Sequence, residues 1–152
     1  MSRFTEVLLV SPLSDGRTWV TMKDFGYDVG KEGSGDTVNV DIGFMTDFAS
    51  VPRPLWVILP RWGKYGNAAV IHDYLYWEQK RTRKQADDIF REAMGVLGVS
   101  GFTSFLMYWA VKLFGGLAWA GNTRRRQKGP SRVAAVMPQK STAVPADLQA
   151  AK

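Results

Sequence analysis

The residues that could carry out chemistry gather around the only histidine of the chain, His72, which is followed directly by Asp73. A further carboxylate, Asp87, comes fifteen residues after the histidine, inside a second helical pattern. A carboxylate on one imidazole nitrogen fixes the tautomer and leaves the other nitrogen to take a proton from water. Thiolate catalysis and cysteine-ligated zinc are excluded because the chain has no cysteine. The pattern therefore predicts a His72–Asp87 dyad that activates water.

Two helices have to position these side chains. The first is expected to follow Gly66-Asn67 and to run to about residue 80, and the second is expected over residues 83–97. If they form a hairpin that turns near Arg81, His72 and Asp87 are offset by about 4.5 Å along the helix axes. A contact between the imidazole and the carboxylate is then within reach.

The helical faces indicate how each side chain is used. At about 100° per residue, Asp87 lies at the margin of an apolar arc, and the next residue, Asp88, points toward water. His72 is directed toward packed neighbours, Tyr76 lies one turn after it, and Asp73 is turned about 100° away. A buried core histidine whose bond to a carboxylate is purely structural remains the alternative interpretation.

A second polar stretch follows the last expected strand. Its small polar side chains, Thr46, Asp47 and Ser50, are of the kind that satisfy backbone amides in a turn. In the functional interpretation, Asp47 adds a second carboxylate to the cleft of His72. Carbonyls of the loop over residues 61–67, just before the helix of His72, could coordinate a hard cation. No organic cofactor is expected.

The first half of the chain has the pattern of strands and the second half that of helices. Val38, Val40 and Ile42 alternate with polar or small residues, as in a half-buried strand, and residues 4–10 and 17–22 are two further strand candidates. The expected fold class is α+β, with a small N-terminal antiparallel sheet packed against three helices.

The third helical segment, residues 102–114, is apolar on nearly all sides and is expected to end at Gly115-Gly116. A lysine near its middle, Lys112, and the paired glycines argue against a membrane span. A buried core helix is favoured, with a partner-contacting or membrane-surface helix as the alternative.

The positive charge of the chain is concentrated near its end. Seven of the 20 basic residues and one of the 14 acidic residues lie beyond residue 121, which leaves 13 of each in residues 1–121. We therefore expect one domain over residues 1–121 and a flexible basic tail over 122–152, whose deletion leaves folding intact. Weak contacts to phosphate or anionic lipid are expected from the tail residues Arg124, Arg125, Arg126 and Lys128.

Three stretches together resemble the DUF1353 family of bacteriophage and prophage proteins, over about residues 1–120. They are Gly43-Phe44-x-Thr46-Asp47-x-Ala49-Ser50-Val51-Pro52-Arg53, the segment from Gly63-Lys64-Tyr65 to His72-Asp73-Tyr74-Leu75-Tyr76, and Ala86-Asp87-x-x-Phe90. The resemblance implies a phage origin and supplies no established activity.

The two helical motifs are also similar to the paired-helix active site of phospholipase A2, particularly the cysteine-free form on parvovirus capsids. This resemblance implies that His72 is the base, Asp73 a calcium ligand and Asp87 the residue that orients the histidine. Carbonyls near Gly63 and Gly66 would replace the calcium loop, whose full glycine-rich form is absent here, and the spacing between the helices is shorter than in the viral enzymes.

The leading expectation is therefore a phage-encoded hydrolase with a His-Asp dyad and a calcium site, acting on phospholipid or another envelope ester. The alternative is a non-catalytic virion, tail or head–tail assembly protein that binds other phage particle proteins and whose polar cluster is structural. A host-directed factor that binds nucleic acid through its tail is a third interpretation. No signal peptide pattern is apparent, so the host cytoplasm or the virion is the expected location.

Overall fold

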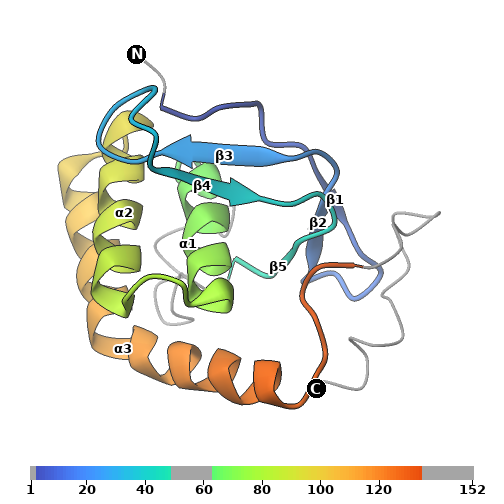
Figure 1. Cartoon of the computed structure of the whole chain (residues 1–152). Helices are drawn as coiled ribbons and strands as arrows, with labels where there is room; N and C mark the ends of the chain where they lie inside the picture. Colours follow the sequence, from blue (N-terminus) through green and yellow to red (C-terminus); the bar gives the residue numbers. More distant parts are fainter. Residues whose placement is uncertain (1–2, 49–62, 135–152) are drawn as a thin grey trace.

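The computed structural model describes residues 3–48 and 63–134. Within them, five short strands precede three helices: β1 (Val10–Pro12), β2 (Trp19–Thr21), β3 (Phe25–Asp28), β4 (Thr37–Val40), β5 (Met45–Thr46), α1 (Gly66–Glu78), α2 (Arg83–Val96) and α3 (Gly101–Gln127). Figure 1 shows β3 and β4 lying across α1, with α2 beside α1 and α3 on the outside of α2. The predicted α+β class, with antiparallel strands and three helices, is confirmed.

The strands form two small antiparallel sheets instead of the single sheet that the sequence predicted. One has the order β1-β2-β5 and the other is the hairpin β3-β4, in which Phe25 pairs with Val40. The predicted alternation in β4 is confirmed for Val38 and Val40, which are buried, whereas Ile42 lies beyond the strand and is exposed. Of the expected strand over residues 4–10, only Val10 belongs to β1.

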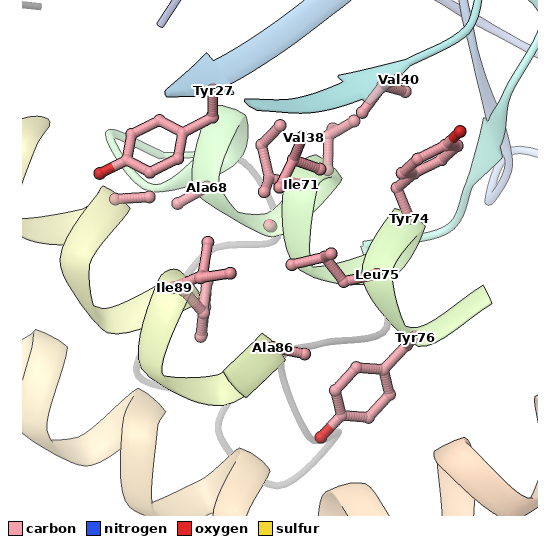
Figure 2. Packing of buried hydrophobic residues seen from close by; sticks show 14 of the residues in the cluster. Tyr27, Val38, Val40, Ala68, Ile71, Tyr74, Leu75, Tyr76, Ala86 and Ile89 are labelled. Carbon is pink, nitrogen blue, oxygen red and sulfur yellow. The ribbon is translucent and has the colours of Figure 1, made fainter. Parts of the chain in front are cut away.

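The central helix, α1, is buried on almost all sides, as expected for a helix with apolar residues around its whole circumference. In Figure 2, Ile71 and Tyr74 point toward β4, while Tyr76 points away from the sheet toward α3. His72 lies on this same helix and is 1% exposed. The burial of α1 therefore places the imidazole in the interior between the sheet and the other two helices.

The second helix begins with the capping pair typical of helix N-termini. The Thr82 hydroxyl accepts a hydrogen bond from the Gln85 backbone amide, and the Gln85 side chain accepts one from the Thr82 amide. On this amphipathic helix, Asp87 is buried and the Asp88 side chain is 43% exposed and paired with Lys84, as the helical faces predicted. The cap and the amphipathic pattern together fix which face of α2 meets α1.

The third helix is longer than its apolar pattern indicates. The predicted end at Gly115-Gly116 is wrong, because α3 continues to Gln127 with Arg124, Arg125 and Arg126 in its last turn, where cations favour the helix dipole. Figure 1 shows α3 running beside α2 and then turning beneath α1, and a glycine pair is a feature that lets a helix bend. Only one side of α3 is covered, so it is not the fully buried core helix that was expected. Within the described parts of the chain, no helix has the length and apolar character needed to cross a membrane.

The segment after Gly121 packs on the domain as far as the structure describes it. The Asn122 side chain donates to the Tyr76 carbonyl at 3.2 Å, and an Arg126 guanidinium nitrogen donates to the Glu78 carbonyl at 2.7 Å. Further along, Val133 forms a β-bridge with Phe44. These contacts tie the end of α3 and the strand-like segment after it to α1 and to β5.

We expect a chain that ends at Gly121 to be less stable than one that ends at Ala134. The shorter chain loses the last turns of α3 and the bonds of Asn122 and Arg126, which together amount to at least about 2 kcal/mol. Urea unfolding followed by circular dichroism measures the difference, and a chain that ends at Gly129 should lie between the two because it keeps α3. Equal urea midpoints for all three chains would contradict this assignment.

Candidate functional site

His72 and Asp87 meet in the interior, as the hairpin geometry predicted. The imidazole Nε2 of His72 lies 2.9 Å from Oδ1 of Asp87, and the two residues are 1% and 2% exposed. The imidazole ring also packs against Phe90, with ring centroids 4.7 Å apart. An ionised carboxylate only accepts hydrogen bonds, so the imidazole donates through Nε2 in this contact.

Tyr76 and Arg83 complete the surroundings of the Asp87 carboxylate. The Tyr76 hydroxyl donates to Oδ1 of Asp87 at 2.6 Å, and a guanidinium nitrogen of Arg83 lies 3.6 Å from Oδ2. Burial raises the pKa of the Tyr76 phenol well above its ordinary value, and the bond to Asp87 raises it further. Tyr76 is therefore a protonated donor at every pH at which a hydrolase works, and Asp87 is held by groups from both α1 and α2.

A glycine of α3 makes room for this arrangement. A Cβ atom at Gly115 would collide with the Tyr76 hydroxyl, whereas a Cβ atom at Gly116 would meet nothing within 4 Å. The same stretch of α3 is tied to the site by Arg83, which donates to the Lys112 carbonyl at 3.0 Å. Gly115 therefore allows α3 to approach the His72–Asp87 pair closely.

The polar stretch around β5 contributes one carboxylate, Asp47, and contacts another, Asp73 of α1. The Thr46 hydroxyl, which is fully buried, donates to Oδ2 of Asp73 and so joins the end of β5 to α1. Asp47 pairs with Arg132, at 3.4 Å between a guanidinium nitrogen and Oδ1. Ser50, the remaining supporting residue predicted from the sequence, lies outside the described residues.

These groups border a cavity of about 520 Å³, which we call the His72 cavity. Its polar lining comes from Asp47, His72, Asp73, Tyr76, Asn122, Arg125 and Arg132. Its apolar lining comes from one side of α3, namely Val111, Phe114, Leu117 and Ala118, with Gly115 and Gly121 between them. Such a cavity suits an amphiphilic molecule whose polar end lies near the imidazole.

Three of the polar lining residues, Asn122, Arg125 and Arg132, were not expected near His72, and Arg125 was expected only to contact anions from the tail. The signal for two of them was present, because Ala118, Asn122 and Arg125 recur at the three- and four-residue spacing of one helical face. Ending the helix at Gly115-Gly116 hid this spacing. Arg132 had no local signal, since its position depends on the pairing of Val133 with Phe44.

The four expected cation ligands divide into two groups. Asp47 and Asp73 both line the His72 cavity, but Gly63 and Gly66 are not among its described lining residues. The Gly63 carbonyl instead accepts the Gly66 amide at 2.9 Å in the turn that begins α1. In the described ranges, no three histidine or acidic side chains gather in a way that could hold a metal ion. Of the four expected cation ligands, the two carboxylates therefore border the cavity, and the two glycines lie at the turn that begins α1.

We expect Gly115→Ala to disturb the site and Gly116→Ala to serve as its matched control. The first change forces Tyr76 away from Asp87, at about 1–3 kcal/mol, although alanine is the better helix former by about 1 kcal/mol. The second change meets open space, so its urea midpoint should be unchanged or raised. Adding Tyr76→Phe to Gly115→Ala removes the colliding hydroxyl and should recover part of the loss. Equal midpoints for the two glycine variants would show that α3 does not approach Tyr76 as described.

The comparisons with known proteins give a family assignment and no relative of known activity. A model of the family described as "Protein of unknown function (DUF1353)" matches residues 19–111, which include β2 to β5, α1, α2 and the first part of α3. No curated protein and no solved structure was found to match the chain. The matched segment contains His72, Asp73, Tyr76 and Asp87 as well as the polar stretch at Thr46 and Asp47. The chain therefore belongs to the DUF1353 family.

Proposed function

We propose that this protein is a hydrolase that cleaves the carboxylic ester of a lipid-like molecule bound in the His72 cavity. The observation that carries the proposal is the position of a buried His-carboxylate pair at the polar end of a cavity whose other wall is apolar. An imidazole oriented by a carboxylate is a common general base in hydrolysis, because the contact fixes which ring nitrogen faces the water molecule.

His72 is the base in the proposed reaction. Its Nδ1 takes a proton from a water molecule while the water oxygen attacks the carbonyl carbon of the ester, and a tetrahedral oxyanion forms. The imidazolium that results is stabilised by the Asp87 carboxylate at 2.9 Å from Nε2. When the ester bond breaks, the imidazolium returns the proton to the leaving alkoxide, so the products are an acid and an alcohol.

Arg125 is the group best suited to the negative charge of the intermediate or to an anionic head group. It lines the cavity, and its side chain makes no hydrogen bond or ion pair with another described residue, whereas Arg132 is paired with Asp47. Although Arg125 is exposed, its guanidinium can donate to a developing oxyanion or to an anionic group of a bound ligand. Phospholipid, or another envelope ester with an anionic group, fits this combination best.

The apolar wall accounts for the acyl part of the substrate. Phe114 and Leu117 line the cavity and are also exposed, so an acyl chain can enter between the cavity and the surface along α3. A phage-encoded enzyme of this type would act on the host envelope, as the resemblance to phage proteins implied. The competing interpretation, a non-catalytic particle component with a structural polar cluster, differs in that it requires no turnover.

We expect His72→Asn to lower the hydrolysis of a soluble short-chain ester by about 10²–10⁴-fold. Because His72 is buried, urea unfolding is used to check that the His72→Asn variant is folded. A second variant, at an exposed position, keeps the test independent of folding. That variant is Arg125→Gln, expected to lower kcat by at least about tenfold. Its matched control is Arg124→Gln, which changes the neighbouring arginine outside the cavity lining and should leave kcat unchanged.

The assay is run both with calcium and with a chelator, because Asp47 and Asp73 line the cavity. If hydrolysis by the wild type requires calcium and the Asp73→Asn variant no longer responds to calcium, the proposal extends to a cation site. Turnover at the background level in the wild type under both conditions would overturn the hydrolase and leave the structural interpretation of the polar cluster. Equal activity of the Arg125→Gln and Arg124→Gln variants would remove Arg125 from the mechanism.

A further inference from the structure

We propose that the outer face of α3 lies on the surface of an anionic lipid bilayer. The outer face of α3 is defined by six large apolar residues that are exposed: Phe102, Phe105, Trp109, Leu113, Phe114 and Leu117. The proposal that α3 docks on a bilayer depends only on the surface of α3. The further step, in which the bilayer supplies the ester that is cleaved, rests on the proposed function.

The apolar residues are arranged along one side of the helix. They recur at three- and four-residue spacing over about four turns, and the exposed fraction reaches 75% for Phe102 and 82% for Leu117. Figure 1 shows α3 at the edge of the molecule, with no described element on its outer side. Monomeric proteins seldom expose so many large apolar residues together unless the surface contacts a partner or a membrane.

The charge of α3 indicates which kind of partner fits. The helix contains no aspartate or glutamate, and its cations are Lys112, Arg124, Arg125 and Arg126, followed by Lys128 at the C-cap. A bilayer that contains anionic lipid offers an apolar phase for the aromatic residues and negative head groups for the arginines within one surface. A second copy of the chain would present the same cations and no acidic residue on α3 to pair with them.

The position of Lys112 is consistent with a helix that lies in the plane of the interface. Its ammonium lies 5.4 Å from the centre of the Trp109 ring, beside the outer face of α3, and a lysine at such a place can extend its charge to the head groups while its stem covers apolar surface. Tryptophan is itself favoured at membrane interfaces because one end of the indole is apolar and the other is polar. Since no described helix is able to span a membrane, α3 would rest on the bilayer surface.

The outer face of α3 is continuous with the His72 cavity. Phe114 and Leu117 belong to both, so the edge that would touch acyl chains is also the edge of the cavity. Arg125, which lines the cavity, lies one residue from Arg124, which is exposed. A lipid drawn from the bilayer would therefore meet apolar residues first and the imidazole last.

Binding to vesicles tests the docking proposal without any need for turnover. Vesicles of ether-linked lipids, which contain no carboxylic ester, are made either from phosphatidylcholine alone or with an equal share of phosphatidylglycerol. The full chain should co-sediment at least tenfold more tightly with the anionic vesicles, and added salt should weaken this preference. Absence of binding to the anionic vesicles, or equal binding to both kinds of vesicle, would overturn the proposal.

Two double variants distinguish a specific contribution of α3 to vesicle binding from a general contribution of exposed apolar residues. Phe102→Gln with Leu113→Gln removes two exposed side chains that do not line the cavity and should weaken vesicle binding at least tenfold. Val7→Gln with Leu9→Gln removes two exposed apolar side chains near the strands and should leave binding unchanged. Equal loss in both double variants would contradict a specific role of α3. Concentration-dependent self-association that only the α3 variant abolishes, without vesicle binding, would assign the face to a second copy.

The contribution of the basic residues at the end of α3 to vesicle binding is tested on the same vesicles. Arg124→Gln with Lys128→Gln should lower the preference for phosphatidylglycerol at least fivefold, whereas Arg17→Gln with Lys31→Gln should not. The soluble-ester assay distinguishes this inference from the proposed function. Vesicle binding without ester hydrolysis would support docking and reject the enzyme, and ester hydrolysis without vesicle binding would do the opposite.

Discussion

The burial of one carboxylate, Asp87, determines how the three helices fit together. A carboxylate that is 2% exposed has lost most of its hydration, and an unpaired buried charge of this kind is too costly for a marginally stable domain. Its compensation comes from the His72 imidazole and the Tyr76 hydroxyl on α1 and from the Arg83 guanidinium on α2. Because Arg83 also donates to a carbonyl of α3, all three helices depend on the same small group of polar contacts.

This constraint explains why a glycine is placed in the middle of a long helix. Glycine costs a helix about 1 kcal/mol relative to alanine, yet any side chain at Gly115 would push the Tyr76 hydroxyl away from Asp87. Val111, Leu117 and Ala118 of α3 line the same cavity as His72, which gives the cavity its mixed lining. The imidazole of α1 and the apolar wall from α3 thus border one cavity.

Features that depend on local chemistry or regular helix geometry could be predicted from the sequence. The Thr82–Gln85 cap and the meeting of His72 with Asp87 follow from spacing alone, since the rise and rotation of a helix are nearly constant. The alternation of Val38 and Val40 identified β4 for the same reason.

Features that depend on tertiary contacts were missed. In β3, Phe25, Gly26 and Tyr27 are all buried, so this strand has no alternating pattern to detect. The continuation of α3 past Gly115-Gly116 opposes intrinsic helix propensity and is stabilised by bonds from distant residues, such as Gln79 to the Trp119 carbonyl at 2.9 Å.

The His72 cavity and the polar network around Asp87 are two separate features of the site. A network that served only to lock α1 to α2 would need Asp87 and its donors, and it would gain nothing from a neighbouring cavity. Here the imidazole borders a cavity of about 520 Å³ that is also lined by Arg125, an exposed residue whose side chain has no hydrogen bond or ion pair with another described residue. A solvated cation of this kind adds neither a desolvation cost nor a stabilising contact to the packing of the helices. The cavity lining is therefore the part of the structure that the packing of α1 against α2 does not explain, and the proposed hydrolysis depends on that part.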